Sequence, residues 1–457
     1  MRDKPDTITS TRRALVRAGS ILTVAALAAC APPGSGSTTP EPDPDAPVQE
    51  VSTELTTEDV ELDLYLESGF TDAWDALQEE FTRQYPNVTF RVRADSFQNL
   101  AQNAVRIINA PDAPDLIRFP TVASAAKDGL LANLDPYAAA YGWDDWPQGT
   151  LNQVRVEPDG SRGSGSLYAL GVGYNTTGLY YNKDIAADLG IEVPPATIAE
   201  LEQMMEAAKA ADVVPMMVGN ADFTVAFPYQ MVQNQQPGLD DLKDWIYNAP
   251  DASFDIEASV TAAETIQRWA GEGYFPDDVN AIDYSTMVGR FADGRALFMP
   301  NGDWEAGGLT SGGSGDFGFF LFPGVQEGAP HVAMAAPATY VVPSTASNKD
   351  EVAYFLDWIH TDEVARQIVL DVTGSSPGGP AELPAPVAPE GSVIEETLAA
   401  AATLADDDGA IDFIGNATTG ILTSTIGPDL QLLVSDRITP EEFAASVQQG
   451  YQTELGR

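Results

Sequence analysis

The sequence predicts an α/β protein of two lobes, with a chain that crosses between them three times. Residues 60–119 alternate strand-like and helix-like patterns, which is typical of a parallel sheet covered by helices. Residues 167–184 are apolar, β-branched and aromatic, but Gly171 and Gly173 interrupt the pattern. A strand that glycines break and that then resumes suits a chain passing between lobes, and a second set of strand and helix patterns follows it.

The first lobe is predicted to start at Val60, because residues 60–66 alternate apolar and polar side chains. Thr71 can cap a helix that places Trp74 and Phe81 on one face. The next expected elements are a strand at 88–92, a helix at 98–109 and a strand at 114–119. In parallel sheets, ligands lie beyond the carboxyl ends of the strands. The candidates at these ends are Glu67, Ser68, Phe119 and Thr121.

The second lobe is predicted to repeat this alternation. Thr197 can cap a helix over residues 197–211, and Glu200 can return the capping bond. A strand at 213–218 and a later strand ending at Met299 are each followed by a polar loop. By the same rule about strand ends, the candidates in these loops are Asp222, Phe223, Asn301, Asp303 and Trp304.

The C-terminal region is predicted to be mainly helical. Residues 348–371 form two helical patterns broken at Thr361, and residues 374–378 then carry the chain back to the second lobe. After Pro389 every remaining element is expected to be a helix. Residues 439–442, Thr-Pro-Glu-Glu, are typical of a helix start with a capping box.

The composition excludes several classes of partner and site. Lys and Arg number 23 against 68 Asp and Glu, which gives the 457-residue chain a net charge of −45. Such a surface repels nucleic acid and anionic substrates. The charge leaves two interpretations open, a salty habitat or selection for a cationic ligand. With two histidines and one cysteine in the chain, a structural zinc site and a disulfide framework are excluded by ligand count, and no metal or other cofactor is expected.

The N-terminus predicts export and anchoring. Arg12, Arg13 and Arg17 precede an apolar run that is too short to span a bilayer. Residues 27–30, Leu-Ala-Ala-Cys, match the lipobox of bacterial lipoproteins, which implies cleavage before Cys30 and lipidation of its thiol. The paired arginines also fit a twin-arginine signal, so the choice between that route and Sec export stays open.

This processing divides the N-terminal region into two segments. Residues 1–29 are the predicted signal peptide. Residues 30–57 are rich in proline, small and acidic residues, and we expect them to form a lipid-anchored linker that holds the folded body away from the membrane.

A characteristic order of motifs follows Gly171: an apolar run, Tyr-Tyr-Asn-Lys-Asp, Gly-Ile, and Pro-Pro-Ala-Thr ahead of an amphipathic helix. A later strand leads into Gly-Asp-Trp at residues 302–304. This order resembles the extracellular solute-binding proteins of ABC importers, family 1, and within it the maltose-binding-like branch. The resemblance covers essentially the whole folded body. It implies a periplasmic-binding-protein-like (type II) fold with three interlobe crossings.

The resemblance also implies lobe boundaries. The first lobe would comprise residues 58–173 and 338–376, and the second lobe residues 174–337 and 377–457. The crossings would lie near residues 173–176, 335–339 and 374–378. Closure of the lobes on a ligand would then be a hinge motion at these crossings.

In this family, a tryptophan at the position of Trp304 commonly stacks on a pyranose ring while carboxylates and amides bond the hydroxyls. An aromatic residue at the position of Phe119 often faces the cleft. Asn175 stands where maltose binders often carry a carboxylate, and the proline usual before the first crossing is missing near Gly171, which argues against maltose itself. Asn175 and Tyr340 complete the set of ligand-binding candidates.

We therefore expect an extracytoplasmic substrate-binding lipoprotein, not an enzyme, that binds a mono- or oligosaccharide and delivers it to the transmembrane subunits of an ABC permease. It is expected to be a monomer, held on the outer face of the bacterial cytoplasmic membrane by its lipid anchor. A polyamine or another cationic solute is the alternative ligand, which the charge favours. A cell-surface glycoside hydrolase is the alternative from another class.

Two motifs of enzymes occur outside their required context. Residues 374–378 satisfy G-x-S-x-G, but a helix precedes the serine, and His331 and His360 both lie upstream of it. Residues 313–318 satisfy G-x-G-x-x-G, but they lead into a strand instead of opening a helix. Neither a hydrolase nucleophile nor a dinucleotide site is predicted.

Overall fold

The computed structural model describes residues 51–68, 71–119 and 121–457. The predicted signal peptide, Cys30 and most of the predicted linker lie outside these residues. One core of buried apolar side chains draws on residues 62–172 and 340–369, and two neighbouring cores draw on residues between 179 and 451. We call the elements around the first core the first lobe, and those around the other two the second lobe.

The helices and strands of the first lobe are β1 (Val60–Glu67), α1 (Thr71–Gln84), β2 (Val88–Asp95), α2 (Phe97–Ile108), β3 (Leu116–Arg118), α3 (Ala123–Lys127), α4 (Asp135–Tyr141), α5 (Gln148–Leu151), β4 (Arg155–Val156), β5 (Ser166–Leu167), α13 (Lys349–Thr361) and α14 (Glu363–Thr373). Two strands are shared between the lobes, β6 (Ala169–Asn182) and β10 (Ala333–Val341). The elements of the second lobe are α6 (Lys183–Leu189), α7 (Ile198–Ala210), β7 (Val214–Met216), α8 (Ala226–Asn234), α9 (Leu239–Ile246), α10 (Glu257–Gly271), α11 (Tyr284–Ala292), β8 (Ala296–Gly302), α12 (Ala306–Gly312), β9 (Phe317–Phe320), α15 (Val393–Asp406), β11 (Ala410–Ile411), α16 (Gly427–Leu433) and α17 (Pro440–Leu455).

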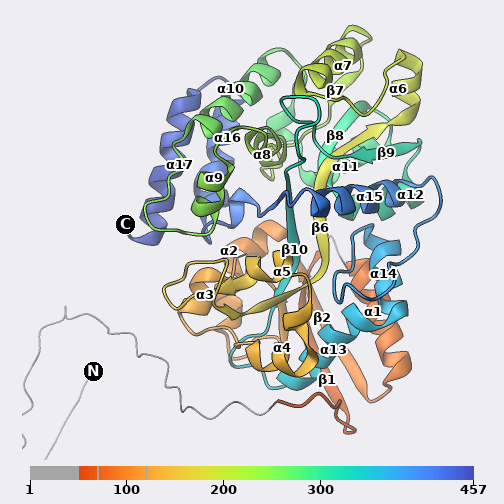
Figure 1. The fold of residues 1–457 in the computed structure, drawn as a ribbon, viewed down its shortest axis with the longest axis vertical. Coiled ribbons are helices and arrows are strands. Elements are labelled where there is room, and N and C mark those ends of the chain that lie inside the picture. The colour runs from red at the N-terminus through yellow and green to blue at the C-terminus, as the bar shows by residue number, and fades with distance from the viewer. Residues whose placement is uncertain (1–50, 69–70, 120) are drawn as a thin grey trace, which may run out of the picture. The chain divides into compact units, whose positions relative to one another are not determined.

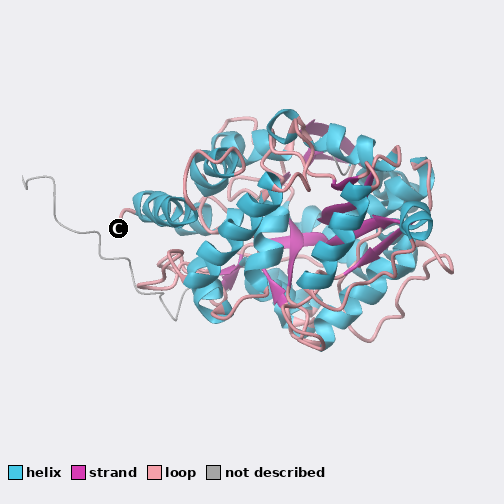
Figure 2. Cartoon of the chain, turned by 90° about the horizontal axis from the view of Figure 1, so that it is seen from above, coloured by secondary structure: helices cyan, strands magenta, loops and turns pink. Residues whose placement is uncertain are grey.

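A mixed sheet runs through both lobes in the strand order β2-β1-β3-β10-β6-β8-β7, with β11 paired to β10 and β9 paired to β6. β1 is parallel to β2 and β3, whereas β10 is antiparallel to β3 and β6. Leu62, Leu64 and Leu66 of β1 are fully buried, which confirms the predicted alternation. Helices surround the strands (Figure 2), so the apolar faces of the sheet are covered, as the α/β pattern predicts.

β6 passes from the first lobe into the second, and the antiparallel β10 returns from the second lobe to the first (Figure 1). The sequence predicted two short strands separated by a glycine break, but β6 is one strand of 14 residues. Gly173 adopts φ +84° inside this strand, and the register between β6 and β10 shifts at the same level, between Pro337 and Thr339. The glycine bends the strand at the crossing without ending it, because glycine adopts this left-handed conformation without a steric penalty.

The third crossing follows α14, which ends at Gly374 with φ +80°. A Cβ at this position would lie 2.5 Å from the Cβ of Ala306 and 2.7 Å from the carbonyl oxygen of Asp303. Glycine therefore allows α14 to approach the second lobe closely. The N–H of Tyr174 donates to the carbonyl oxygen of Ser376 at 2.7 Å, which ties the first crossing to the third.

His360 of α13 also joins these two crossings. Its Nδ1 lies 2.8 Å from the carbonyl oxygen of Pro377, and its Nε2 lies 2.7 Å from that of Gly171. The imidazole is buried, and burial lowers the pKa of His360 to about 4, although the two carbonyl groups act in the opposite direction.

The C-terminal region follows the prediction in part. The break between α13 and α14 is confirmed, with Asp362 capping α14, and the capping box of Thr439 and Glu442 is present. The expectation that everything after Pro389 is helical is wrong, because β11, a 3-10 turn (Ile414–Asn416) and a π-helical segment (Leu422–Ile426) interrupt the helices. The side chain of Gln230 bonds the carbonyl of Asp412 and the N–H of Ile414, and these long-range bonds hold the segment out of a helix.

Candidate functional site

The loop that follows β3 meets the second lobe directly. The hydroxyls of Thr121 and Ser124 lie 3.3 Å and 2.9 Å from the hydroxyl of Thr419. α2, which follows β2, packs against the π-helical segment of the second lobe. The carboxyl ends of these first-lobe strands therefore lie at the junction of the lobes, where a ligand of an α/β sheet is expected.

Residues 157–165 form an arm that reaches from the first lobe onto the second. The arm connects β4 and β5, and its Arg162 lies on the second lobe with its side chain only 3% exposed. Nη1 of Arg162 donates to Oδ2 of Asp412 at 2.7 Å, and Nη2 donates to the carbonyl oxygen of Ile246 at 2.8 Å. The guanidinium also lies 5.2 Å from the ring centroid of Tyr247. A buried ion pair thus joins the two lobes.

A small cavity lies beside this ion pair, lined by Val122 and Gln153 of the first lobe, Pro337 of β10, and Asp412 and Asn416 of the second lobe. Its volume of about 10 Å³ is the space of a single water molecule. A sugar is therefore too large for this part of the junction in the conformation described.

Trp304 follows β8 and lies in the second lobe with its ring partly exposed. Its indole covers Gly302, since a Cβ on that glycine would lie 1.8–2.2 Å from three ring carbons. The ring of Phe227 meets it edge to face, with centroids 6.0 Å apart, and Phe413 lies 5.9 Å beyond Phe227. The three rings form an aromatic row on the second lobe.

Tyr284, at the start of α11, holds the polar edge of this indole. Nε1 of Trp304 donates to the hydroxyl of Tyr284 at 2.6 Å. That hydroxyl donates to Oε1 of Glu305 and lies 3.2 Å from Oδ1 of Asn301. Burial raises the pKa of the Glu305 carboxyl group and raises that of Tyr284 well above its ordinary value.

Asp303 lies at the hinge, and its side chain is 1% exposed. Its Oδ2 accepts the N–H of Thr176 in β6 at 3.0 Å, and its Oδ1 accepts the hydroxyl of Ser375 in the third crossing at 2.7 Å. Burial raises the pKa of Asp303 well above its ordinary value, and these hydrogen bonds oppose that rise. The hydroxyl of Ser375 also lies 3.1 Å from Oδ1 of Asn175, so a second candidate, Asn175, lies beside Asp303 at the hinge.

Phe119 and Tyr340 are brought together in the core of the first lobe, each 1% exposed. The hydroxyl of Tyr340 accepts the indole N–H of Trp74 at 2.8 Å, and the two rings meet edge to face. In this arrangement both side chains pack in the lobe instead of facing the junction.

The remaining candidates lie on the rims of the two lobes. Glu67 accepts a hydrogen bond at 2.9 Å from Arg118, whose guanidinium also donates to the carbonyl oxygen of Thr339 in β10. Ser68 is exposed. In the second lobe, Asp222 accepts the backbone N–H of Tyr284 at 3.0 Å.

Phe223 has φ +67°, and its ring covers Gly427. A Cβ on that glycine would lie 2.2 Å from the ring, so Phe223 is held against α16. The ring of Phe223 thus helps to fix the loop that follows β7.

Sequence reasoning missed Arg162, Phe227, Tyr284 and Glu305. The only available signals were aromatic residues close to predicted strand ends and an arginine in a glycine-rich loop. Both signals are common in proteins of this size, and each role depends on a contact with a distant residue.

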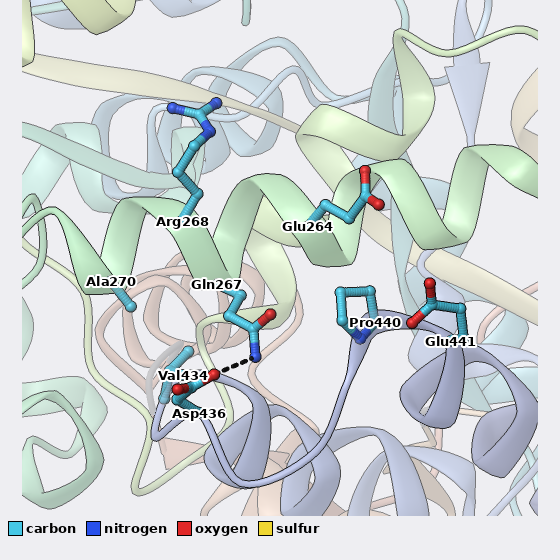
Figure 3. A pocket seen from close by; sticks show the side chains of 9 residues that line it. Glu264, Gln267, Arg268, Ala270, Val434, Asp436, Pro440 and Glu441 are labelled. Atoms are coloured by element: carbon cyan, nitrogen blue, oxygen red, sulfur yellow. Dashed lines mark hydrogen bonds between the residues drawn. The ribbon is translucent and has the colours of Figure 1, made fainter.

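Other features of the described residues lie away from this junction. A hollow of about 510 Å³ is lined by residues of α10 and of the segment that leads into α17, among them Gln267, Arg268, Asp436 and Glu441 (Figure 3). Within the described ranges there is no cluster of three or more His, Cys, Asp or Glu side chains able to hold a metal ion. Among these described residues, no helix is both long enough and apolar enough to cross a bilayer.

Comparison with known proteins gives consistent results. A maltotriose-binding protein of Pyrococcus abyssi is 27% identical over 327 residues, 65% of this chain and 62% of that protein. A galactooligosaccharide-binding protein of Bacillus subtilis is 23% identical over 255 residues, 54% of this chain and 57% of that protein. The matched regions thus span less than two thirds of each relative.

The fold is shared with solved structures. A chitin oligosaccharide binding protein superposes with a TM-score of 0.73 at 17% identity, covering 87% of this chain and 99% of that one. The family model for bacterial extracellular solute-binding proteins matches residues 67–366, which include parts of both lobes and two of the three crossings. The chain therefore belongs to the bacterial extracellular solute-binding protein family.

Proposed function

We propose that this protein binds a mono- or oligosaccharide between its lobes and delivers it to an ABC permease. The single observation that carries the proposal is the indole of Trp304. One face of the indole lies on Gly302, its N–H is engaged by Tyr284, and the ring stays partly exposed beside Phe227. A fixed aromatic face without a free polar group suits the CH-rich face of a pyranose.

The carboxylates near the junction favour a neutral ligand over a polyamine. Four of them are already engaged: Glu67 by Arg118, Asp412 by Arg162, Asp303 by Thr176 and Ser375, and Glu305 by Tyr284. A polyamine would need carboxylates that are free to pair with its ammonium groups. The names of the maltotriose- and galactooligosaccharide-binding relatives also support a sugar.

The same engagement argues against glycoside hydrolysis. A glycosidase needs one carboxyl group to protonate the leaving oxygen and another on the opposite side of the bond. Asp303 instead binds the hinge through both oxygens, and Glu305 binds Tyr284 through Oε1, so both carboxyl groups already make structural contacts. We propose a binding protein without enzymatic activity.

Delivery requires opening and closing of the lobes. We propose the lobe boundaries given by the sequence, residues 58–173 with 338–376 and residues 174–337 with 377–457, and a hinge at the three crossings. We further propose that the mature protein is a monomer, anchored through a lipid on Cys30 to the outer face of the cytoplasmic membrane.

Thermal-shift titration tests the proposal with a panel of maltose, maltotriose, raffinose, galactooligosaccharides, chitin oligosaccharides and spermidine. A ligand at 100 times its dissociation constant stabilises the folded state by about 2.7 kcal/mol. We expect at least one sugar, and not spermidine, to raise the melting temperature. Stabilisation by spermidine alone would contradict the sugar proposal, and turnover of a chromogenic glycoside would contradict the assignment as a pure binding protein.

A further inference from the structure

We infer that Tyr284 and Glu305 are positioning residues that hold the indole of Trp304 in the orientation that receives a sugar. The inference rests on the proposed function, because it assigns a role to residues that act through Trp304. It concerns side chains that neither the sequence motifs nor the comparisons single out.

The first step is the anchoring of the indole edge. Nε1 of Trp304 donates to the hydroxyl of Tyr284 at 2.6 Å. A tryptophan N–H has no acceptor function, so this bond uses the whole polar capacity of the ring. The anchored ring cannot turn its N–H toward a ligand, and what remains exposed is an apolar face.

The second step is the direction of the hydrogen bonds at Tyr284. A phenol carries one proton, and the hydroxyl of Tyr284 donates it to Oε1 of Glu305. This donation leaves an oxygen lone pair to accept from Trp304. Oε1 of Glu305 accepts this proton, so the phenol is the donor toward Glu305 and the acceptor toward the indole N–H.

The backbone of Tyr284 is fixed as well. Its N–H donates to Oδ2 of Asp222 at 3.0 Å, and Asp283 caps the helix that Tyr284 begins. The hydroxyl therefore has a defined position relative to β8. Two different elements, α11 and the turn after β8, meet through a single phenolic oxygen.

The third step is the surface beneath the ring. Gly302 lies under the indole so closely that any side chain there would overlap three ring carbons. The indole is therefore held by Gly302 on one face, by Tyr284 at its edge and by Phe227 across a 60° interplanar angle. Loss of the edge anchor leaves the ring free to rotate off Gly302.

The test uses calorimetric titration to measure the sugar affinity of Tyr284→Phe, Trp304→Ala and the double variant. The sugar is maltotriose, or another panel sugar if that one binds more tightly. We expect about tenfold weaker binding for Tyr284→Phe and about thirtyfold for Trp304→Ala. The double variant should lose about thirtyfold, not the three-hundredfold of independent effects, because the tyrosine acts through the indole.

Two further variants separate positioning from general damage to the lobe. Tyr229→Phe removes another buried phenol of the second lobe, whose hydroxyl donates to the carbonyl of Ser259, and should leave affinity within about twofold. Glu305→Gln keeps an oxygen that accepts from Tyr284, and it should retain more affinity than Glu305→Ala. The ring N–H signal of Trp304 in an NMR spectrum, protected from exchange in the wild type, should become exchangeable in Tyr284→Phe.

The outcomes are distinguishable. If Trp304→Ala binds sugar weakly but Tyr284→Phe binds it normally, the positioning role of Tyr284 is overturned and the sugar proposal stays intact. Additive losses in the double variant, or equal losses in Tyr229→Phe, also overturn it. Normal binding by Trp304→Ala overturns the indole as the sugar platform, and the positioning role falls with it.

Discussion

Asp412→Asn should weaken sugar binding without weakening the ligand-free fold. The substitution removes the charge that Arg162 meets at 2.7 Å and turns an amide group toward the guanidinium. Oδ1 of Asp412 accepts the N–H of Phe413 and the amide of Asn416, contacts that lie within the second lobe. The perturbation is therefore concentrated on the bond between the lobes.

The magnitude follows from burial. Arg162 and Asp412 are 3% and 4% exposed, and breaking such a buried pair by altering one partner costs about 3–5 kcal/mol. Arg162 keeps its bond to the carbonyl of Ile246, so we take the lower end, about 3 kcal/mol. If the pair forms on closure, this cost falls on the closed form alone and weakens binding about a hundredfold.

The assay is calorimetric titration with the best panel sugar, combined with denaturant unfolding of the ligand-free protein. Arg155→Met is the control, since Arg155 lies at the base of the same arm, pairs with Asp144 and Asp135 and bonds the carbonyl oxygen of Gly165, and makes none of these bonds to the second lobe. It should cost about 1 kcal/mol of stability or less and leave affinity unchanged. Unchanged affinity for Asp412→Asn, together with a loss of about 3 kcal/mol in unfolding, would refute the idea that the Arg162–Asp412 pair forms on closure, because the arm would then be docked in the open form too.

Three further predictions test other parts of the chain. As the pH is lowered from 6.5 to 4, His360 becomes protonated in the unfolded chain but stays neutral in the folded protein, so acidification lowers the free energy of unfolding. This loss should be up to about 3 kcal/mol greater in the wild type than in His360→Gln, as measured by urea unfolding at pH 7 and 4.5. The net charge of −45 should make stability rise as salt is raised to about 1 M, where the Debye length is near 3 Å, with sugar affinity nearly constant; a steep loss of affinity would point to a cationic ligand. Cys30→Ser should move the protein from the membrane fraction to the medium, provided that the signal peptide is still cleaved, and a mature N-terminus other than Cys30 would contradict lipidation.

Local sequence patterns were sufficient for elements whose stability is local. The alternation in β1, the break before α14 and the capping box at Thr439 all depend on residues a few positions apart. The segment after Asp406 could not be predicted in this way. Asp412 meets Arg162 across 250 residues, and Ile414 meets Gln230 across 184, and neither separation leaves a periodic signal.

The candidate site likewise combines local features, which the sequence predicts, with long-range contacts, which it does not. The Gly-Asp-Trp motif placed Trp304 at a strand end, but it gave no information about the partners of the indole. The ring of Trp304 covers Gly302 two residues away, a local contact that the motif does not reveal, whereas the contact of the ring edge with Tyr284 appears only when β8 and α11 lie side by side. Phe119, at the end of β3, lies in the core because a strand end can turn its side chain toward either layer.

Three consecutive residues after β8 make different connections, and this arrangement couples the proposed sugar platform to the hinge. Asp303 bonds the first crossing through Thr176 and the third through Ser375. Glu305 bonds Tyr284, which in turn anchors the indole of Trp304. In the proposed function, a sugar contacts the indole on a 3-10 turn whose first residue bonds two of the three crossings, so contact with the ligand and the angle between the lobes would depend on the same three residues. Asp303→Asn keeps the size of the side chain but presents an N–H to one of two donors. Although Asp303 is buried, the substitution should therefore weaken sugar affinity in calorimetric titration by disturbing closure, and unchanged affinity would contradict the coupling.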